Sequence, residues 1–289
     1  MKTVKTSIML LAFLCCHLVT AQKSSETSTE ELNFSSKSSE NMLIVKNING
    51  PIQIEGYDGN SIKLEAEKTI SANRESYLEE GKQEIQIKTE EVGNRIYVYV
   101  ISPNNDFNTA SGRYENRRKN DQWVKLDYNF HVAFKLKIPR STNVELATMN
   151  DGDIYAKDVQ GNEIIVSNLN GAITLENIAG KTNVNALNKD INITYYKNPS
   201  EDSKYHSLNG DVNVTFKENL NADVSFKSLN GDMYTNYDTV KLSPELVKKK
   251  TKNGKGVKYN MSSNQSYRIG NGGIKLDFEL LNGDATLKK

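Results

Sequence analysis

The chain has 289 residues, of which 25% are charged and 37% are hydrophobic, and its formal net charge is +1 at pH 7. This near-neutral balance argues against a nucleic-acid-binding protein, because such proteins present a basic face to the phosphates. Both cysteines, Cys15 and Cys16, lie close to the N-terminus, so the rest of the chain can hold neither a disulfide nor a thiolate metal site.

The first residues have the organisation of an export signal. Two lysines precede an apolar stretch from Ile8 to Val19, which is too short to span a bilayer. Small residues up to Ala21 fit a cleavage site, so we expect residues 1–21 to be a signal peptide and Gln22 to begin the mature protein. A retained membrane anchor and lipidation of a cysteine are the alternatives. No later segment approaches membrane length, and we expect an exported protein of the periplasm, the outer-membrane surface or the cell exterior.

The chain after the signal divides into three predicted regions. Residues 22–40 are rich in Ser, Thr and Glu, a composition that predicts a flexible tether. Residues 41–140 alternate apolar and polar residues and predict an N-terminal β region or cap, with one short helix near residues 71–83. Its clearest strand is Val124 to Ile138, where every even-numbered residue is apolar or aromatic. The third region, residues 141–289, contains a repeat.

The repeat centres on the tetrapeptide Leu-Asn-Gly-Asp, which is complete at Leu208, Leu229 and Leu281. In complete and degenerate copies its asparagine recurs with spacings of 20, 18, 21 and 21 residues, at Asn150, Asn170, Asn188, Asn209 and Asn230. A fixed period of this size predicts stacked copies of one unit, here two short strands and two turns. The predicted fold is all-β: a β-solenoid with a less regular N-terminal β region, with a Greek-key β-sandwich as the alternative.

Each residue of the tetrapeptide has a structural explanation at a corner between strands. Glycine tolerates a positive φ, and the asparagine amides of successive coils can bond to one another in a ladder. The leucine is expected to point inward and fill the corner, and the aspartate to accept backbone N–H groups. The predicted corner residues are Asn150, Asn170, Asn188, Asn209, Gly210, Asn230, Gly231, Asn282 and Gly283.

Two segments interrupt the β pattern. The first, residues 102–122, together with the residue that follows it, contains aromatic and arginine residues of the kind that anchor recognition surfaces. It is the candidate ligand-contact loop, with residues Arg113, Tyr114, Arg117, Arg118 and Trp123. The second is an inserted basic loop near residues 243–264, whose lysines suit anionic lipid head groups or lipopolysaccharide phosphates. For both segments an ordinary solvated loop is the alternative.

No motif in the sequence indicates catalysis. His131 and His206 have no second ligand at a metal-binding spacing, and there is no nucleophile elbow or phosphate-binding glycine motif. The repeat aspartates suggest a calcium row or an acid–base pair as alternatives to structural turns, namely Asp151, Asp153, Asp211, Asp232 and Asp284. One Gly-Asp in about 20 residues is sparse for a calcium-binding repeat. We therefore expect no catalytic residue, no cofactor and no metal.

The order of these features resembles the putative-adhesin, β-strand-repeat domain family of Gram-negative envelope proteins. The resemblance covers about residues 41–289, and it is carried by the segment Asn47 to Ile52, the strand end Leu136 to Pro139 and the Asn-Gly-Asp repeats. It implies an exported, β-helical, non-enzymatic protein of a family largely of unknown function, and it supplies no catalytic residues.

The expected function is a non-catalytic, adhesin-like binding or structural module of the cell envelope, with a glycan or an envelope protein as its partner. The alternatives are a polysaccharide-active β-helix enzyme and an envelope assembly or stress factor with a protein partner. The sequence leaves the oligomeric state open.

Overall fold

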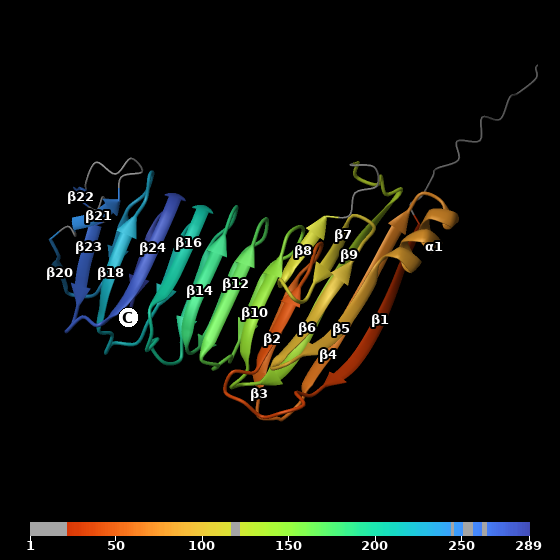
Figure 1. The fold of residues 1–289 in the computed structure, drawn as a ribbon, viewed down its shortest axis with the longest axis horizontal. Coiled ribbons are helices and arrows are strands. Elements are labelled where there is room, and N and C mark those ends of the chain that lie inside the picture. Colours follow the sequence, from red (N-terminus) through yellow and green to blue (C-terminus); the bar gives the residue numbers. More distant parts are fainter. Residues whose placement is uncertain (1–21, 117–121, 244–245, 251–256, 262–264) are drawn as a thin grey trace, which may run out of the picture.

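The structure, a computed structural model, describes residues 22–116, 122–243, 246–250, 257–261 and 265–289. Within these residues the strands form one sheet of ten strands (sheet A), one of eleven strands (sheet B) and two separate hairpins. Figure 1 shows the strands side by side along the long axis of the molecule. A mostly β protein is thus confirmed. The described residues contain one helix, α1 (Glu75–Glu84), and none long and apolar enough to cross a membrane.

The two sheets run along the molecule in the same direction, starting at the end that holds α1. Sheet A consists of β1 (Gln22–Leu32), β4 (Ile62–Ala72), β9 (Tyr128–Pro139), β3 (Ile52–Tyr57), β11 (Ile154–Lys157), β13 (Ile173–Ile178), β15 (Ile191–Tyr195), β17 (Val212–Thr215), β25 (Ala285–Lys288) and β19 (Met233–Thr235). Sheet B consists of β5 (Gln86–Val92), β6 (Arg95–Ile101), β2 (Met42–Lys46), β10 (Asn143–Thr148), β12 (Glu163–Asn168), β14 (Lys181–Ala186), β16 (Ser203–Asn209), β24 (Ile274–Asn282), β18 (Ala222–Lys227), β23 (Gln265–Ile269) and β20 (Thr239–Lys241). The hairpins are β7 (Asn105–Asn108) with β8 (Arg113–Asn116), and β21 (Leu246–Lys250) with β22 (Val257–Met261).

In the repeat region the chain alternates between the sheets, and we call one strand of sheet B with the next strand of sheet A a winding. Each strand pairs in parallel with its counterpart in the next winding, for example Val144 with Ile164, Ile164 with Thr182, and Val184 with Tyr205. These pairs are 20, 18 and 21 residues apart, like the asparagines of the repeat. The Greek-key alternative does not describe this region, because a Greek key is built from antiparallel pairs.

Inward side chains of equivalent strands stack into one core. Ile154, Ile173, Ile191 and Val212 are aligned across sheet A, and all four are 0% exposed. Residues between them point outward, because side chains alternate along a strand. The long amphipathic strand follows the same rule in β9, where the even-numbered residues from Val132 to Ile138 are at most 3% exposed.

The windings are not stacked in chain order at either end. Near the N-terminus, β2 and β3 lie between β10–β11 and the strands β6 and β9. Near the C-terminus, β24 and β25 lie between β16–β17 and β18–β19, and Figure 1 shows β24 between β16 and β18. The expected boundary at residue 141 therefore divides one continuous stack, and residues 265–289 are not a simple cap. A parallel strand is reached by a crossover, so its neighbour need not be adjacent in sequence.

The structure corrects the tether expected over residues 22–40. The segment Gln22–Leu32 forms β1, which pairs antiparallel with β4 over its whole length. Nearly all its side chains are exposed, so its composition resembles that of a disordered segment. An edge strand is held by main-chain hydrogen bonds to one neighbour, which require no apolar residues. Leu32 and Phe34 add contacts with the core.

The segment predicted as a basic loop near residues 243–264 also differs from the expectation. In its described part, β21 and β22 pair antiparallel from Leu246 with Met261 to Lys250 with Val257. The lysine-rich run is therefore one arm of a hairpin, since backbone pairing does not depend on the charge of the side chains.

Candidate binding surface

The asparagines of the repeat form one hydrogen-bonded row along a corner of the stack. Each side-chain amide donates to Oδ1 of the asparagine in the neighbouring winding, over 2.8 to 3.2 Å. In spatial order the row is Asn49, Asn150, Asn170, Asn188, Asn209, Asn282 and Asn230. An amide both donates and accepts, so one residue type can extend the row through every winding.

The corner glycines are required by close packing of the windings. A Cβ on Gly171 would lie 1.9 Å from the carbonyl oxygen of Gly152, and a Cβ on Gly231 would lie 1.9 Å from that of Gly283. Positive φ, the reason expected from the sequence, applies at Gly231 and Gly283 but not at Gly171 or Gly210. The absence of a side chain therefore matters at more corners than the backbone conformation does.

The repeat aspartates tie successive windings together. Oδ1 of Asp211 accepts a hydrogen bond from the backbone N–H of Asp284 at 2.9 Å, and Oδ1 of Asp284 accepts one from the N–H of Asp232 at 2.8 Å. The equivalent bond one winding earlier joins Asp190 to the N–H of Asp211. Among the described residues, no three His, Cys, Asp or Glu side chains gather so that they could hold a metal ion.

The leucines of the repeat point outward, which corrects the expectation that they fill the corners. Leu208 and Leu281 are each 37% exposed and Leu229 is 71% exposed, whereas Leu280 is 4% exposed. Side chains alternate along each strand, so the residue before the motif leucine takes the inward position. The outward leucines, with a groove of about 480 Å³ beside them, form a line that we call the leucine stripe: Leu169, Leu187, Leu208, Leu281 and Leu229.

Tyr114 of the candidate ligand-contact loop is a packing residue. Its ring lies edge-on to Phe107 with centroids 5.3 Å apart, and its hydroxyl donates to the carbonyl oxygen of Lys46 at 3.0 Å. Burial raises the pKa of this hydroxyl well above its ordinary value. A ring and hydroxyl held in this way cannot reach a ligand at the surface.

The other members of that loop are not brought together as one site in the described part of the chain. Arg113 is exposed on β8, and Trp123 is 53% exposed. Arg117 and Arg118 lie outside the described residues.

Neither histidine belongs to a recognisable catalytic arrangement. His206 lies on the outer face of sheet B, with Nε2 3.6 Å from Oδ2 of Asp277. Hydrogen bonding to His206 is the largest cause that lowers the pKa of Asp277. His131 lies on β9, where it pairs across from Thr69 of β4.

The outer face of sheet A carries an uncharged row across seven adjacent strands. Strand register aligns one outward side chain from each strand, and all of them are exposed or half-buried. We call this set the polar row: Gln53, Tyr155, Thr174, Asn192, Asn213, Thr286 and Tyr234. Within it, Nδ2 of Asn213 donates to Oδ1 of Asn192 at 3.2 Å. The sequence could not reveal this row, because its members come from distant segments.

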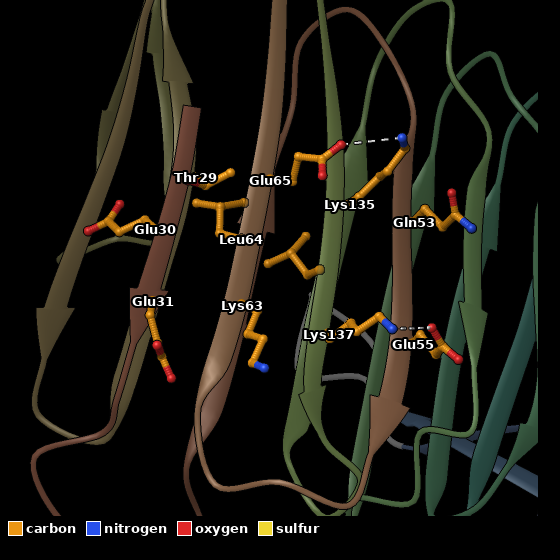
Figure 2. Close-up of a pocket in the computed structure, with 11 residues that line it drawn as sticks. Thr29, Glu30, Glu31, Gln53, Glu55, Lys63, Leu64, Glu65, Lys135 and Lys137 are labelled. Carbon is orange, nitrogen blue, oxygen red and sulfur yellow. Dashed lines mark hydrogen bonds and ion pairs between the residues drawn. The ribbon is translucent and has the colours of Figure 1, made fainter. Parts of the chain in front are cut away.

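The polar row leads into a charged groove at the end of sheet A that holds β1. The groove has a volume of about 490 Å³ and is lined by residues of β1, β4, β9 and β3. Figure 2 shows two ion pairs in it, with Nζ of Lys135 3.4 Å from Glu65 and Nζ of Lys137 3.6 Å from Glu55. Each pair joins two adjacent strands, so both carboxylates already have a cationic partner.

These features define a class: a β-repeat protein with largely parallel sheets, whose windings expose long rows of equivalent side chains. The chain belongs to the family described as Toastrack DUF4097, whose model matches residues 133–277, just over half of the sequence. No curated protein matches this sequence.

The chain is similar to several solved bacterial structures. A protein described as a putative cell adhesion protein from Clostridium sporogenes has 10% identity, with 92% of this chain and 99% of that chain covered and a TM-score of 0.46. A putative adhesin from Bacteroides fragilis has 8% identity, 91% and 96% coverage and a TM-score of 0.29. A putative adhesin from Parabacteroides merdae has 10% identity, the same coverage and a TM-score of 0.27. The family resemblance expected from the sequence is thus confirmed.

Proposed function

We propose that the protein is an exported, non-catalytic binding module of the cell envelope, and that it binds an extended glycan along the polar row of sheet A. The stack of windings is a β-solenoid in this proposal. Such a repeat protein presents a long surface of regularly spaced groups, which suits a long partner better than a compact one. Release of a mature protein that begins at Gln22 is the corresponding expectation for export.

The polar row is the observation that carries the proposal. Hydroxyl and amide side chains both donate and accept hydrogen bonds, as sugar hydroxyls do. Strands of a sheet lie about 4.8 Å apart, so the row offers such groups at short, regular intervals. The two tyrosines, Tyr155 and Tyr234, add aromatic faces that can pack against the C–H faces of sugar rings. A row without charge favours a neutral or weakly charged polymer.

The test compares two asparagines on opposite faces of the stack. Asn192 is exposed on β15 within the polar row, and Asn185 is exposed on β14 on the outer face of sheet B. Soluble polysaccharides of the envelope and of plant and animal surfaces are screened by affinity electrophoresis against the full chain. We expect Asn192→Lys to weaken the binding of a retained polysaccharide about tenfold or more, and Asn185→Lys to leave it unchanged. Equal effects of the two changes, or no retention of any glycan, would contradict the proposal.

The rival function is a polysaccharide-active enzyme. The ion pairs of Glu55 with Lys137 and of Glu65 with Lys135 support a binding role for the groove, because a general acid or base needs a carboxyl that is free to exchange a proton. The same screen therefore includes a search for shortened products. Turnover that disappears in Glu65→Gln would replace the binding proposal with the enzymatic one.

The leucine stripe favours a second candidate function, an envelope factor with a protein partner. Contiguous exposed apolar patches commonly mark protein contacts. A pull-down from envelope extract would compare Leu208→Ser with Leu208→Met. We expect a specific partner to be lost with serine and kept with methionine, and identical recovery with both variants would exclude the stripe.

A further inference from the structure

β1 is an unusually open sheet edge. It is the first strand of sheet A and has one neighbour, β4. Its 11 residues contain no proline, and the pairing with β4 runs without a register shift from Gln22 to Leu32. The opposite edge of sheet A, β19, has only three residues, as has β20 at the matching edge of sheet B. Proteins usually protect long, straight edges, because such edges offer free backbone groups to another strand.

We propose that β1 is a dimerisation strand, which pairs antiparallel with β1 of a second copy of this chain about a two-fold axis at Thr27. In this register Lys23 of each copy lies opposite Glu31 of the other. Ser24 faces Glu30, Ser25 faces Thr29, and Glu26 faces Ser28. No like charges are directly opposite, and the strand's only lysine meets a carboxylate twice. Cross-strand pairs of opposite charge stabilise a sheet, and like charges destabilise it.

Neighbouring symmetric registers lack this complementarity. A two-fold axis at Ser28 would place Glu26 opposite Glu30 twice, and an axis at Glu26 would place that residue opposite itself. An axis midway between Thr27 and Ser28 avoids like charges but places Lys23 opposite Leu32. The Thr27 register is therefore the one that satisfies the charges on the strand.

The proposed pairing also fits the charges on β4. Within one copy Glu31 already lies opposite Lys63, so its carboxylate would sit between two lysines, Lys63 of its own chain and Lys23 of the second copy. The dimer would join two copies of sheet A edge to edge. The groove of Figure 2 has Thr29, Glu30 and Glu31 in its wall, so two grooves and two polar rows would lie in one continuous sheet. Two linked sites on one polymer gain avidity through effective concentration.

Charge reversal tests the register. Sedimentation velocity of the purified full chain over a range of concentrations is expected to show a monomer–dimer equilibrium. Lys23→Glu and Glu31→Lys should each weaken the dimer about tenfold or more, because each places like charges opposite one another twice. An equimolar mixture of the two variants should restore it, since every facing pair is then Glu with Lys. Melting curves and intact mass confirm that each variant is folded and has the same N-terminus.

A single cysteine on the axis provides an independent test. Two copies of Thr27→Cys would have Cα atoms about 4.5–5.5 Å apart, within disulfide range. In the matched control, Ser25→Cys, the two cysteines would be about 14 Å apart, because they lie four residues out of register. We expect mild oxidation to cross-link the first variant and not the second, with the joined peptide identified by mass spectrometry. A protein that stays monomeric at all concentrations, a dimer indifferent to Lys23→Glu, or equal cross-linking of both cysteine variants would overturn the proposal.

Discussion

The side-chain amide of Asn282 donates a hydrogen bond to Oδ1 of Asn209 at 2.8 Å, although 73 residues separate the two in sequence. Asn230, the next asparagine of the repeat after Asn209, donates instead to Asn282 at 2.8 Å. The C-terminal winding is thus inserted between two windings that follow each other in the chain. The corner row is continuous in space but not in sequence.

We expect Asn209→Ala to destabilise the protein more than Asn230→Ala does. Asn209 donates to Asn188 and accepts from Asn282, whereas Asn230 ends the row with one such bond. The expected losses are about 1–2 kcal/mol and about 0.5–1 kcal/mol, because each exposed hydrogen bond contributes little net free energy. Urea unfolding at constant m-value measures both. Equal losses would contradict the different positions of the two residues in the row.

Gly171→Ala tests the close contact between windings. The added Cβ would meet the carbonyl oxygen of Gly152 at 1.9 Å, so the windings must separate, at a cost of about 1–3 kcal/mol. Gly112→Ala is the control, since nothing lies within 4 Å of a Cβ there and only its φ of +66° opposes the change, at about 1 kcal/mol. Thermal melting should therefore order the variants with Gly171→Ala lowest. A wild-type melting temperature for Gly171→Ala would show that the windings are further apart.

The neighbouring residues Leu280 and Leu281 provide a direct test of which leucine is inward. Leu280 is 4% exposed and Leu281 is 37% exposed. We expect Leu280→Ala to cost about 2–5 kcal/mol through loss of core packing, and Leu281→Ala less than about 1 kcal/mol. Equilibrium unfolding monitored by circular dichroism distinguishes the two. The reverse order would restore the interpretation in which the motif leucine fills the corner.

The contact between Asp223 and Arg268 predicts a pH-dependent contribution to stability. Nε and Nη2 of Arg268 donate to the carboxylate at 2.7 and 3.0 Å, and these hydrogen bonds are the main cause that lowers the pKa of Asp223. A carboxyl with a lowered folded-state pKa stabilises the protein above its unfolded value, about 3.9, and this contribution is lost as the pH falls through the folded-state value. Arg268→Gln should therefore lower the melting temperature at neutral pH, and the difference should shrink below about pH 4.

The control for that experiment is the double variant Asp223→Asn with Arg268→Gln. If the two side chains act through each other, the double variant should melt close to Arg268→Gln alone at neutral pH. Additive losses, or a difference from wild type that persists unchanged in acid, would show that Arg268 acts through other contacts.

The candidate surfaces were accessible to sequence reasoning only in part. The asparagine positions follow from the repeat, because each corner has the same local requirement for an amide. The polar row does not, since Gln53 and Tyr155 become neighbours only through the pairing of β3 with β11. Tyr114 shows the opposite error: its composition and loop context suggested a surface anchor, but the hydroxyl is held by Lys46 in the interior. The identity of a residue does not state which way its strand faces.

The sequence by itself determined the local architecture: a period of about 20 residues, two strands in each unit, and the alternation that puts Ile154 and Ile173 in the core. These features depend on residue size, polarity and turn chemistry, which act over a few residues. Only the tertiary structure decided the order of the windings, the outward direction of Leu208 and Leu281, and the pairing of β1. Windings with similar corners are interchangeable as neighbours, and the entropy of closing a longer loop rises only slowly with its length. Spacing along the chain therefore could not show that Asn282 lies beside Asn209.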